Sequence, residues 1–364
     1  NLFFKKQNMK KKSLSAKKTI PSNFNFKKIL KDKKILEIYK NFENKIQNLN
    51  DLYKVAISVS GGPDSMALCF LVCCYKFKIN AKFKPFFYLV DHGLRKESKI
   101  EAQLVKKQLN LYKIKLKILN WKGKKPNSNL QSLARNKRYK LIFNECNKSN
   151  IKTLLTAHHQ DDIYETFFSR LLRGSGTEGL SSFSEIEKKF IFKNNLITVV
   201  RPLLSLNKED LLYISKKVFN FYVNDPSNKM ERFQRVRLRN LIENLKNQGL
   251  DFKKLNLTIK NLASSNKAIN EIVDYNISQN TFFQKKKYII SSNFFLFSNE
   301  IIFRSFANII KKISGKKHPP RGKKMINLIN ELKFKDRIKA TLGGTLIEKI
   351  HNSVIVCEEK RKKG

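Results

Sequence analysis

The stretch Val55-Ala-Ile-Ser-Val-Ser-Gly-Gly-Pro-Asp-Ser65 joins an apolar segment to a glycine turn, and a second apolar segment follows directly. This order predicts a strand, a tight turn and a buried helix. The two glycines permit the turn and a close approach of the backbone, and the helix N-terminus offers free N–H groups to an anion. The two serines add hydroxyl donors. We interpret the turn as a phosphate cradle made of Ser60, Gly61, Gly62, Pro63, Asp64 and Ser65.

Two adjacent glycines by themselves are typical of an ordinary turn between a strand and a helix. The flanking serines and Asp64 favour phosphate binding over that alternative. The Walker loop carries a lysine after its last glycine, and none follows Gly62. The cradle therefore belongs to another class of nucleotide-binding turn.

Length and composition predict a soluble protein of two or three domains. The chain has 364 residues, of which 41% are hydrophobic, enough for a full core. The longest apolar run, Met66 to Tyr75, is far shorter than the roughly 20 residues that cross a bilayer. The five cysteines form no C-x-x-C pair and indicate a reducing cytosol, so we expect a cytoplasmic protein with buried, unreactive cysteines.

The formal net charge of +46 predicts a polyanionic partner, and RNA or DNA is the natural one. Alternatively, the net charge reflects compositional drift rather than a binding surface, because lysine is used heavily throughout the chain. Arginine is more informative: nine of the 14 arginines fall between Arg135 and Arg239. Guanidinium groups suit bidentate phosphate contacts, although some of them are equally explained as structural ion-pair partners.

The N-terminal stretch to about Lys31 is rich in lysine and has no acidic residue before Asp32. It lacks the continuous apolar region of a secretory signal. We interpret it as a flexible basic tail, because a transit peptide would be expected to contain arginine.

After the cradle, apolar strands alternate with helical segments, which predicts a doubly wound α/β fold with a parallel sheet. Polar motifs stand where the strands end, and ligands bind at that edge of such sheets. The chain then turns helical near Val236, and a small α+β unit with a Gly343-Gly344 hairpin follows. The expected strands are Phe86 to Val90, Ile114 to Ile118, Thr153 to Thr156, Leu196 to Val200, Tyr288 to Ile290, Phe294 to Phe297 and Val354 to Val356.

Asp162 and Glu165 are three residues apart, so we expect them on one face of a helix, where they could jointly grip a cation or an amine. His158 and Asp162 also have the spacing of ligands in a metal hydrolase. A solvated acidic helix start is the structural alternative.

Several arginines are candidates for phosphate contacts. Arg135 and Arg138 lie three apart on an expected helix whose Leu130, Leu133 and Ala134 face inward. Exposed helix charge explains such residues as well, and a helix-ending glycine explains the turn next to Arg173. The remaining candidates form a dense segment after an Asp225-Pro-Ser-Asn228 turn: Arg232, Arg235, Arg237 and Arg239.

Taken in order, these motifs resemble the tRNA(Ile)-lysidine synthetases, within the PP-loop ATPases. The resemblance runs from Val55 to Arg239. The motifs that carry it are Ser60-Gly-Gly-Pro-Asp-Ser65, Asp91-His-Gly-Leu-Arg95, Asn129-Leu-Gln with Ala134-Arg135 and Arg138-Tyr139, Ala157-His-His-Gln-Asp-Asp162 with Glu165-Thr166, Arg173-Gly-Ser-Gly176, Arg201-Pro-Leu203 and Arg235-Val-Arg-Leu-Arg239. The cradle alone would indicate only the broader superfamily.

The resemblance implies an adenine nucleotide α-hydrolase-like fold and a two-step ligation that uses ATP and Mg²⁺. The wobble cytidine of the CAU anticodon of tRNA(Ile) is adenylated on its C2 oxygen, and free L-lysine then displaces AMP to give lysidine. It also implies four domains: a basic extension (1–50), the catalytic domain (51–235), a helical tRNA-binding domain (236–313) and a small C-terminal unit (314–364).

The resemblance also implies roles for the candidate residues. The cradle would hold the departing pyrophosphate, and Asp64 would hold Mg²⁺ or position the reacting groups. Asp162 and Glu165 would bind the lysine ammonium, and Arg138 would stabilise charge at the adenylate. The implied tRNA contacts are Arg135, Arg173, Arg235, Arg237 and Arg239.

The sequence departs from the family pattern at Ile163, where glutamine is common, and at Met230, where an acid is usual. Three alternatives stay open. A thiolation enzyme of the same superfamily is disfavoured by the missing C-x-x-C pairs, and an amidotransferase-type synthetase would need a source of ammonia. A noncatalytic RNA-binding protein would show no tRNA-dependent ATP–pyrophosphate exchange.

Overall fold

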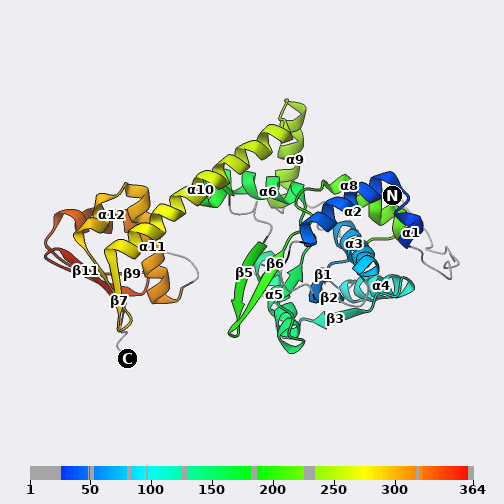
Figure 1. The fold of residues 1–364 in the computed structure, drawn as a ribbon, viewed down its shortest axis with the longest axis horizontal. Helices are drawn as coiled ribbons and strands as arrows, with labels where there is room; N and C mark the ends of the chain where they lie inside the picture. Colours follow the sequence, from blue (N-terminus) through cyan, green and yellow to red (C-terminus); the bar gives the residue numbers. More distant parts are fainter. Residues whose placement is uncertain are drawn as a thin grey trace, which may run out of the picture. The chain divides into compact units, whose positions relative to one another are not determined.

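The chain forms two compact units in a computed structural model (Figure 1). The structure describes residues 26–47, 49, 53–79, 83–95, 97–123, 130–181, 187–224, 234–316, 320 and 322–359. Unit 1 comprises Asn1–Ser169 and Glu185–Asn247, and unit 2 comprises Arg170–Ser184 and Gln248–Gly364. This division differs from the four domains expected from the sequence.

Unit 1 contains the expected parallel sheet, so the predicted fold class is confirmed. Its six strands run in the order β3-β2-β1-β4-β6-β5. Five are parallel: β1 (Lys54–Val59), β2 (Lys84–Asp91), β3 (Leu116–Asn120), β4 (Thr153–Leu155) and β6 (Asn195–Val200). The sixth, β5 (Glu187–Phe192), pairs antiparallel with β6 at the edge. Strand β5 was not predicted, because its first three residues are charged and exposed.

Helices cover both faces of this sheet, and the alternation of β1 shows how. Val55, Ile57 and Val59 point into one apolar core, and Ala56 points into the other. Helices α2, α3, α4 and α8 supply the first core, and α5 supplies the second. The helices of this unit are α1 (Phe26–Ile29), α2 (Lys33–Ile46), α3 (Pro63–Ile79), α4 (Ser98–Leu111), α5 (Leu130–Lys148), α6 (Gln160–Leu171, which ends in unit 2), α8 (Lys208–Val218) and α9 (Gln234–Asn247).

Part of the expected N-terminal extension is integral to unit 1. Asp32 caps α2 by accepting a hydrogen bond from the Ile35 backbone N–H at 3.1 Å. Ile35 and Phe42 are fully buried in the core. The expected tail therefore stops short of α2, and its residues 1–25 lie outside the described part of the chain.

The cysteines of α3 pack as small apolar side chains. Cys69 and Cys74 are buried, and Cys73 is partly buried. Burial raises the pKa of the Cys73 thiol to about 12, so it stays protonated at neutral pH. These residues are suited to packing rather than to thiolate chemistry.

Unit 2 packs helices against an antiparallel sheet of order β7-β8-β11-β10-β9. Its helices are α7 (Thr177–Ser181), α10 (Phe252–Asn280), η3 (Ser292–Leu296), α11 (Asn299–Ser314) and α12 (Gly322–Phe334). Its strands are β7 (Thr281–Gln284), β8 (Lys287–Ile290), β9 (Arg337–Leu342), β10 (Thr345–Ile350) and β11 (Ser353–Glu358).

One expectation for unit 2 is corrected. Phe294 begins an expected strand but lies in η3, where its ring is fully buried. Helix α11 and strands β8, β10 and β11 share one core, which continues across the expected boundary at residue 313.

A buried arginine ties the inserted segment of unit 2 to its main body. Arg304 of α11 donates hydrogen bonds to Thr177 Oγ1 of α7 (2.8 Å), to Asn266 Oδ1 (2.6 Å) and Asn270 Oδ1 (3.3 Å) of α10, and to Glu300 Oε1 (2.7 Å). Four acceptors from three helices therefore depend on one guanidinium.

Replacing Arg304 with Met is expected to destabilise unit 2 by about 3 kcal/mol, because the four hydrogen bonds of a buried guanidinium are lost. Lys312→Met on the same helix is the matched control, since Lys312 is exposed. Urea unfolding and amide hydrogen exchange of α7 measure the effect. Unchanged exchange in α7 would show that the arginine does not hold this helix.

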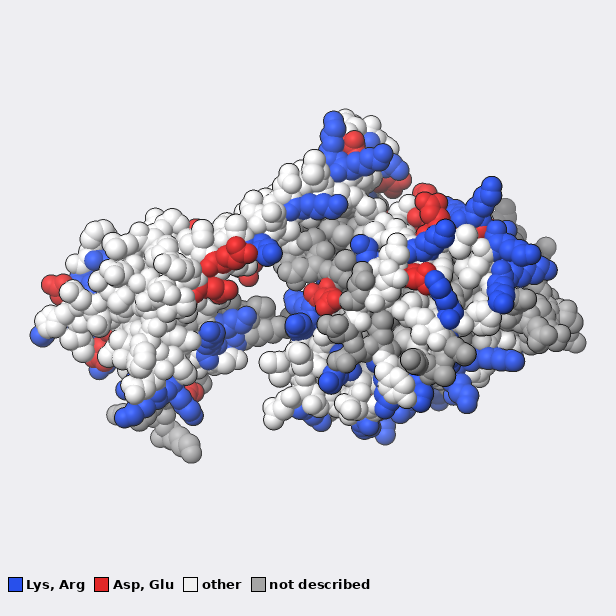
Figure 2. All heavy atoms as spheres, viewed as in Figure 1, with Lys and Arg blue, Asp and Glu red and all other residues white. Residues whose placement is uncertain are grey.

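The net positive charge is spread over the molecule. Figure 2 shows Lys and Arg side chains over much of the drawn face of unit 1, with acidic side chains in a few small groups. Among the described residues, no helix is long and apolar enough to cross a membrane.

Candidate active site

The expected phosphate cradle is the turn between β1 and α3. Ser65 Oγ accepts hydrogen bonds from the backbone N–H groups of Ser60 and Gly61, each at 3.1 Å, and donates to the carbonyl of Gly62 at 3.0 Å. Pro63 is the first residue of α3, where its missing N–H costs nothing. The Ser65 hydroxyl, expected to face a phosphate, thus holds the loop in shape in this structure.

Gly61 is the glycine that the turn requires. Its φ is +84°, and a Cβ on it would lie 2.6 Å from Val105 Cγ2 and 3.2 Å from Val223 Cγ2. The Gly61 carbonyl also accepts a hydrogen bond from the Val223 N–H at 2.8 Å. Gly62 has no positive φ, and its nearest neighbour would be Ser60 Oγ at 3.6 Å. Of these two glycines, therefore, only Gly61 cannot be replaced by a larger residue without a steric clash.

A cavity of about 120 Å³ brings several predicted residues together. Its wall combines the cradle with the arginines of α5 and the residues that follow β4. Those lining it are Ser58, Ser60, Asp64, Ser65, Arg135, Arg138, Tyr139, Thr156, Ala157 and His158. Backbone N–H groups, hydroxyls and two guanidiniums around one cavity suit the phosphates of a nucleotide.

Arg138 reaches the end of the neighbouring strand β2. Its Nε and Nη2 each lie 3.4 Å from His92 Nε2, which accepts because a guanidinium only donates. Burial, and then the nearby Arg135, lower the pKa of Arg138 from its ordinary value. A partly buried cation without a carboxylate partner among the described residues is suited to receive an anionic ligand.

Arg135 orients His158. Arg135 Nη2 lies 3.4 Å from His158 Nε2, so this nitrogen accepts and the ring proton sits on Nδ1. Nδ1 then donates to Thr156 Oγ1 at 2.9 Å, and that hydroxyl donates to the Val200 carbonyl at 3.3 Å. Burial lowers the pKa of His158 to about 3, so the ring is neutral at pH 7.

This neutral histidine predicts a pH dependence. Its folded pKa lies below the unfolded value of about 6.5, so only the unfolded chain takes up the proton as the pH falls through that value. Between pH 7 and pH 5 the free energy of unfolding should drop by about 2 kcal/mol more in the wild type than in His158→Gln. Urea titrations at the two pH values test this, and parallel pH profiles would contradict it.

His159 sits among three carboxylates. Its Nε2 lies 3.6 Å from Asp64 Oδ2 and 3.7 Å from Asp162 Oδ2, and its Nδ1 lies 3.9 Å from Asp161 Oδ1. Burial opposes protonation, but these carboxylates outweigh it and raise the pKa of His159. The same imidazole lowers the pKa of Asp162 against the effect of burial. Asp162 is therefore an anion at neutral pH.

Asp64 fits the expected Mg²⁺ in one respect. Its Oδ1 is buried and has no hydrogen-bond partner among the described residues. A carboxylate oxygen is the hard ligand that Mg²⁺ prefers, with phosphate oxygens as its usual companions. Among the described residues, no group of three or more His, Cys, Asp or Glu is placed to hold a metal.

Glu165, expected to bind the lysine ammonium, is occupied by arginines in this structure. The side chain is 4% exposed, and its Oε1 accepts from Arg239 Nε at 2.5 Å. Arg235 Nε lies 3.9 Å from Oε2. Arg239 and Arg235, predicted to contact tRNA, thus act here as ion-pair partners of the carboxylate. The role of Glu165 in lysine binding stays a prediction.

The remaining predictions meet mixed outcomes. Arg237 and Arg173 are both exposed, and Arg173 belongs to unit 2. Leu133, expected to face inward, is 41% exposed, whereas Ala134 is buried. The Asp225-Pro-Ser-Asn228 turn, Met230 and Arg232 lie outside the described residues.

The sequence analysis gave no separate role to His159 and none to Thr156. Their positions next to the paired aspartates and at the end of β4 were visible in the sequence. Their contacts were not, because Asp64 and Val200 are distant along the chain.

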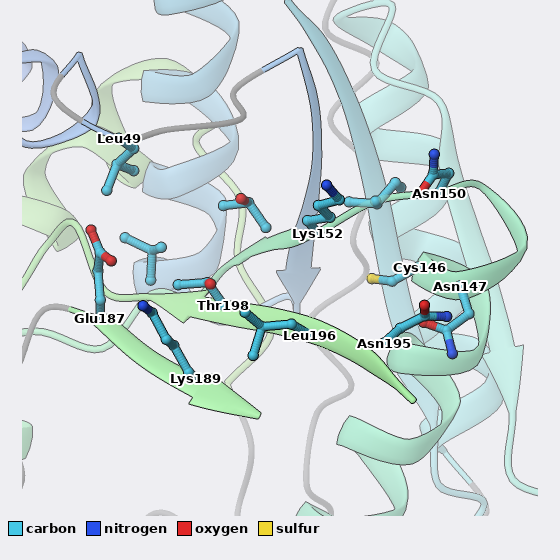
Figure 3. A pocket seen from close by; sticks show the side chains of 13 residues that line it. Leu49, Cys146, Asn147, Asn150, Lys152, Glu187, Lys189, Asn195, Leu196 and Thr198 are labelled. Atoms are coloured by element: carbon cyan, nitrogen blue, oxygen red, sulfur yellow. The ribbon is translucent and has the colours of Figure 1, made fainter. Parts of the chain in front are cut away.

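A larger hollow lies at the opposite edge of the sheet, where β4 and β6 begin (Figure 3). Its volume is about 350 Å³, and Glu187, Lys189, Asn147 and Asn150 are among the residues around it. None of the predicted site residues lines it. The candidate site is therefore the smaller cavity at the cradle.

Comparison with known proteins agrees with this site. The PP-loop domain family matches residues 32–245. The tRNA(Ile)-lysidine synthase of Wolbachia sp. subsp. Brugia malayi is 34% identical over 319 residues, covering 85% of this chain and 71% of that protein. The protein of the same name from Rickettsia typhi is 31% identical over 335 residues, covering 90% and 75%.

Among solved structures, the U34-tRNA thiolase NcsA from Methanococcus maripaludis superposes with a TM-score of 0.51 at 16% sequence identity. The match covers 65% of this chain and 80% of that one. At this identity the likeness concerns the fold alone. The family match over most of the chain, with the cradle inside the matched domain, shows that the chain belongs to the tRNA(Ile)-lysidine synthase family.

Proposed function

We propose that the chain uses ATP to join L-lysine to C2 of the wobble cytidine in the CAU anticodon of tRNA(Ile). The product is lysidine, which changes the codon read from AUG to AUA. The observation that carries the proposal is the single cavity where the cradle meets Arg135, Arg138 and His158, next to the acidic helix α6.

In the first step the cytidine O2 attacks the α-phosphorus of ATP, and pyrophosphate leaves. The arginines of α5 would hold the phosphates. The cradle N–H groups would do so by exchanging their present hydrogen bonds to the Ser60 and Ser65 hydroxyls for the ligand, since such donors stabilise developing negative charge. Mg²⁺ held by Asp64 would neutralise part of that charge. His158, which is neutral and contacts Arg135, would line the site with a polar ring and would not repel the Mg²⁺ ion.

In the second step the lysine ε-amine attacks C2, the C2–O bond breaks and AMP leaves. Asp162 and Glu165 would hold lysine through its ammonium groups. Because Glu165 is bound to Arg239 in this structure, lysine binding requires that this ion pair open or be shared. We also propose a cytoplasmic location, supported by five cysteines that are all free thiols.

The test is incubation of the purified chain with unmodified tRNA(Ile), ATP and labelled lysine. Label retained in the tRNA, together with pyrophosphate release, supports the proposal, and a tRNA whose wobble cytidine is replaced by uridine should accept none. Transfer of labelled sulfur would support a thiolation enzyme instead. Binding of tRNA without ATP–pyrophosphate exchange would indicate a noncatalytic RNA-binding protein.

A further inference from the structure

Unit 1 has a groove at the edge of its sheet where β2 and β3 begin. The volume of this groove is about 850 Å³, against about 120 Å³ for the cavity at the cradle. It is formed by the ends of α3 and α4, the first residues of β2 and the residues before β3. These strands are parallel to β1, and the cradle follows the end of β1. The groove and the candidate active site therefore lie at opposite edges of the sheet.

Much of the groove lining is apolar. Phe87 and Ile114 are buried there, and Cys73 is partly buried. Phe77 presents a ring that is 54% exposed and that stacks on Phe26, with centroids 6.1 Å apart. Apolar surface in a concave site is typical of a place where a ligand or a partner binds.

Four lysines line the same groove, and none of the described residues that line it is acidic. Lys78 is paired with Glu43, its Nζ lying 2.8 Å from Oε1. Lys76, Lys113 and Lys115 are exposed and have no ion-pair partner among the described residues. Lysines in the last turn of α3 also offset its dipole, but Lys115 stands just before a strand and has no such role. The groove thus suits a ligand that is both apolar and negatively charged.

Lys113 stands at a helix end where glycine is usual. It follows the C-cap residue of α4 and has a φ of +59°, which disfavours L-amino acids. Its N–H donates to the Asn110 carbonyl at 3.0 Å, so the backbone makes an ordinary helix end. The turn itself does not require a lysine side chain, and glycine would remove the charge without disturbing the backbone.

Charge argues against an occupant from the chain itself. Residues 1–25, which precede Phe26 directly, carry seven lysines and no acid. A second copy of the chain brings a net charge of +46. The lysines of the groove repel both, so the complementary occupant is an acidic molecule other than this chain.

A protein segment fits the groove better than RNA or a bilayer does. Bases stack on exposed rings, and of the four rings in the groove only Phe77 is more than half exposed. The Tyr112 ring packs edge-on against Phe219, with centroids 4.7 Å apart, and its hydroxyl donates to the Val218 carbonyl at 2.9 Å. A bilayer surface binds protruding apolar side chains rather than a recess. Apolar side chains of a peptide can enter the recess.

We propose that this groove binds an acidic, amphipathic segment of a partner protein. Its apolar side chains pack on Phe77 and the buried lining, and its carboxylates pair with Lys76, Lys113 and Lys115. Amphipathic helices bind grooves in this way. The partner leaves the cradle open, because the groove lies at the other edge of the sheet. The inference does not depend on the proposed function, since neither ATP nor tRNA takes part in this binding.

The experiment measures binding of a labelled synthetic peptide to the full chain by fluorescence anisotropy. The peptide is helical, with leucines on one face and glutamates on the other. One comparison peptide has serine in place of leucine, and another has glutamine in place of glutamate. Each comparison peptide should bind about 10-fold more weakly, because each lacks one of the two properties that the groove matches.

Variants of the groove locate the binding. Phe77→Ala should weaken binding of the leucine–glutamate peptide about 10-fold, because the exposed ring is no longer there to be buried. Lys76→Gln/Lys115→Gln should weaken it about 5-fold and reduce its dependence on salt. The matched controls alter exposed residues outside the groove and should bind as the wild type does: Phe334→Ala on α12 and Lys106→Gln/Lys107→Gln on α4.

Lys113→Gly separates folding from binding. This variant should unfold at a higher temperature than the wild type, since glycine suits the helix end, and should still bind the peptide about twofold more weakly. Amide hydrogen exchange gives an independent location. Residues 73–79 and 111–115 should gain protection when the peptide binds.

Groove variants that bind the peptide as tightly as the control variants do would overturn the inference, as would protection confined to other parts of the chain. Two further probes test the other occupants. If single-stranded oligouridylate, and not the peptide, loses affinity in the groove variants, the groove is an RNA site. If only binding to phosphatidylglycerol vesicles depends on these residues, the groove faces a lipid surface. Either result replaces the protein partner.

Discussion

Glu165→Gln is expected to lower lysine transfer by about 10²–10³-fold while tRNA-dependent ATP–pyrophosphate exchange continues. The substitution keeps the size of the side chain and removes its charge. A buried charged partner of an ammonium group is worth about 2–5 kcal/mol, or about 30- to 5,000-fold, and the expected loss lies within this range. The two half-reactions separate because lysine enters only after the cytidine is activated. Exchange and lysine incorporation are measured on the same preparation.

Glu145→Gln is the matched control for this prediction. Glu145 of α5 is also a buried carboxylate of unit 1, paired with Lys117 at 2.5 Å and Lys148 at 2.8 Å. The two variants should lose comparable stability, yet only Glu165→Gln should lose lysine transfer. Equal losses of transfer in both variants would mean that Glu165 acts only through folding. Loss of exchange in Glu165→Gln would place its role in the first step.

Gly61→Ala is expected to destabilise unit 1 by about 3 kcal/mol and to reduce ATP–pyrophosphate exchange at least 100-fold. Part of the cost is the φ of +84°, and part is the 2.6 Å approach of the new methyl group to Val105 Cγ2. Any relief of this clash moves the cradle N–H groups, and one misplaced donor to a developing charge costs about 10²–10³-fold in rate. Urea unfolding and exchange kinetics measure the two effects.

Alanine substitutions at two other glycines are controls for the two causes, the steric contact and the backbone strain. Gly62→Ala adds a methyl group with an ordinary contact of 3.6 Å and no positive φ, so its stability should stay close to wild type. Gly123→Ala has a φ of +102° with no atom within 4 Å, so it reports backbone strain alone. If Gly61→Ala is no less stable than Gly123→Ala, the contact with Val105 does not constrain the loop.

Structural features that depend on neighbouring residues were predictable from the sequence, whereas features that depend on distant residues were not. The cradle was predictable because strand, glycine turn and helix are consecutive residues. The parallel strands followed from their apolar runs, and the Gly343-Gly344 hairpin followed from its turn residues. β5 was not predicted because a charged edge strand lacks the apolar signal. η3 was mistaken for a strand because its apolar residues are consecutive, although only Phe294 among them is buried.

The sequence by itself determined the fold class, the cradle and the acidic start of α6, since each depends on neighbours within a few residues. Only the tertiary structure decided the partners of these groups. Arg239 meets Glu165 across 74 positions of the chain, and Arg135 meets His158 across 23. Such pairings depend on how helices dock on the sheet. Burial keeps His158 neutral, whereas the His159 imidazole keeps Asp162 charged against the effect of burial. Neither is encoded in local spacing.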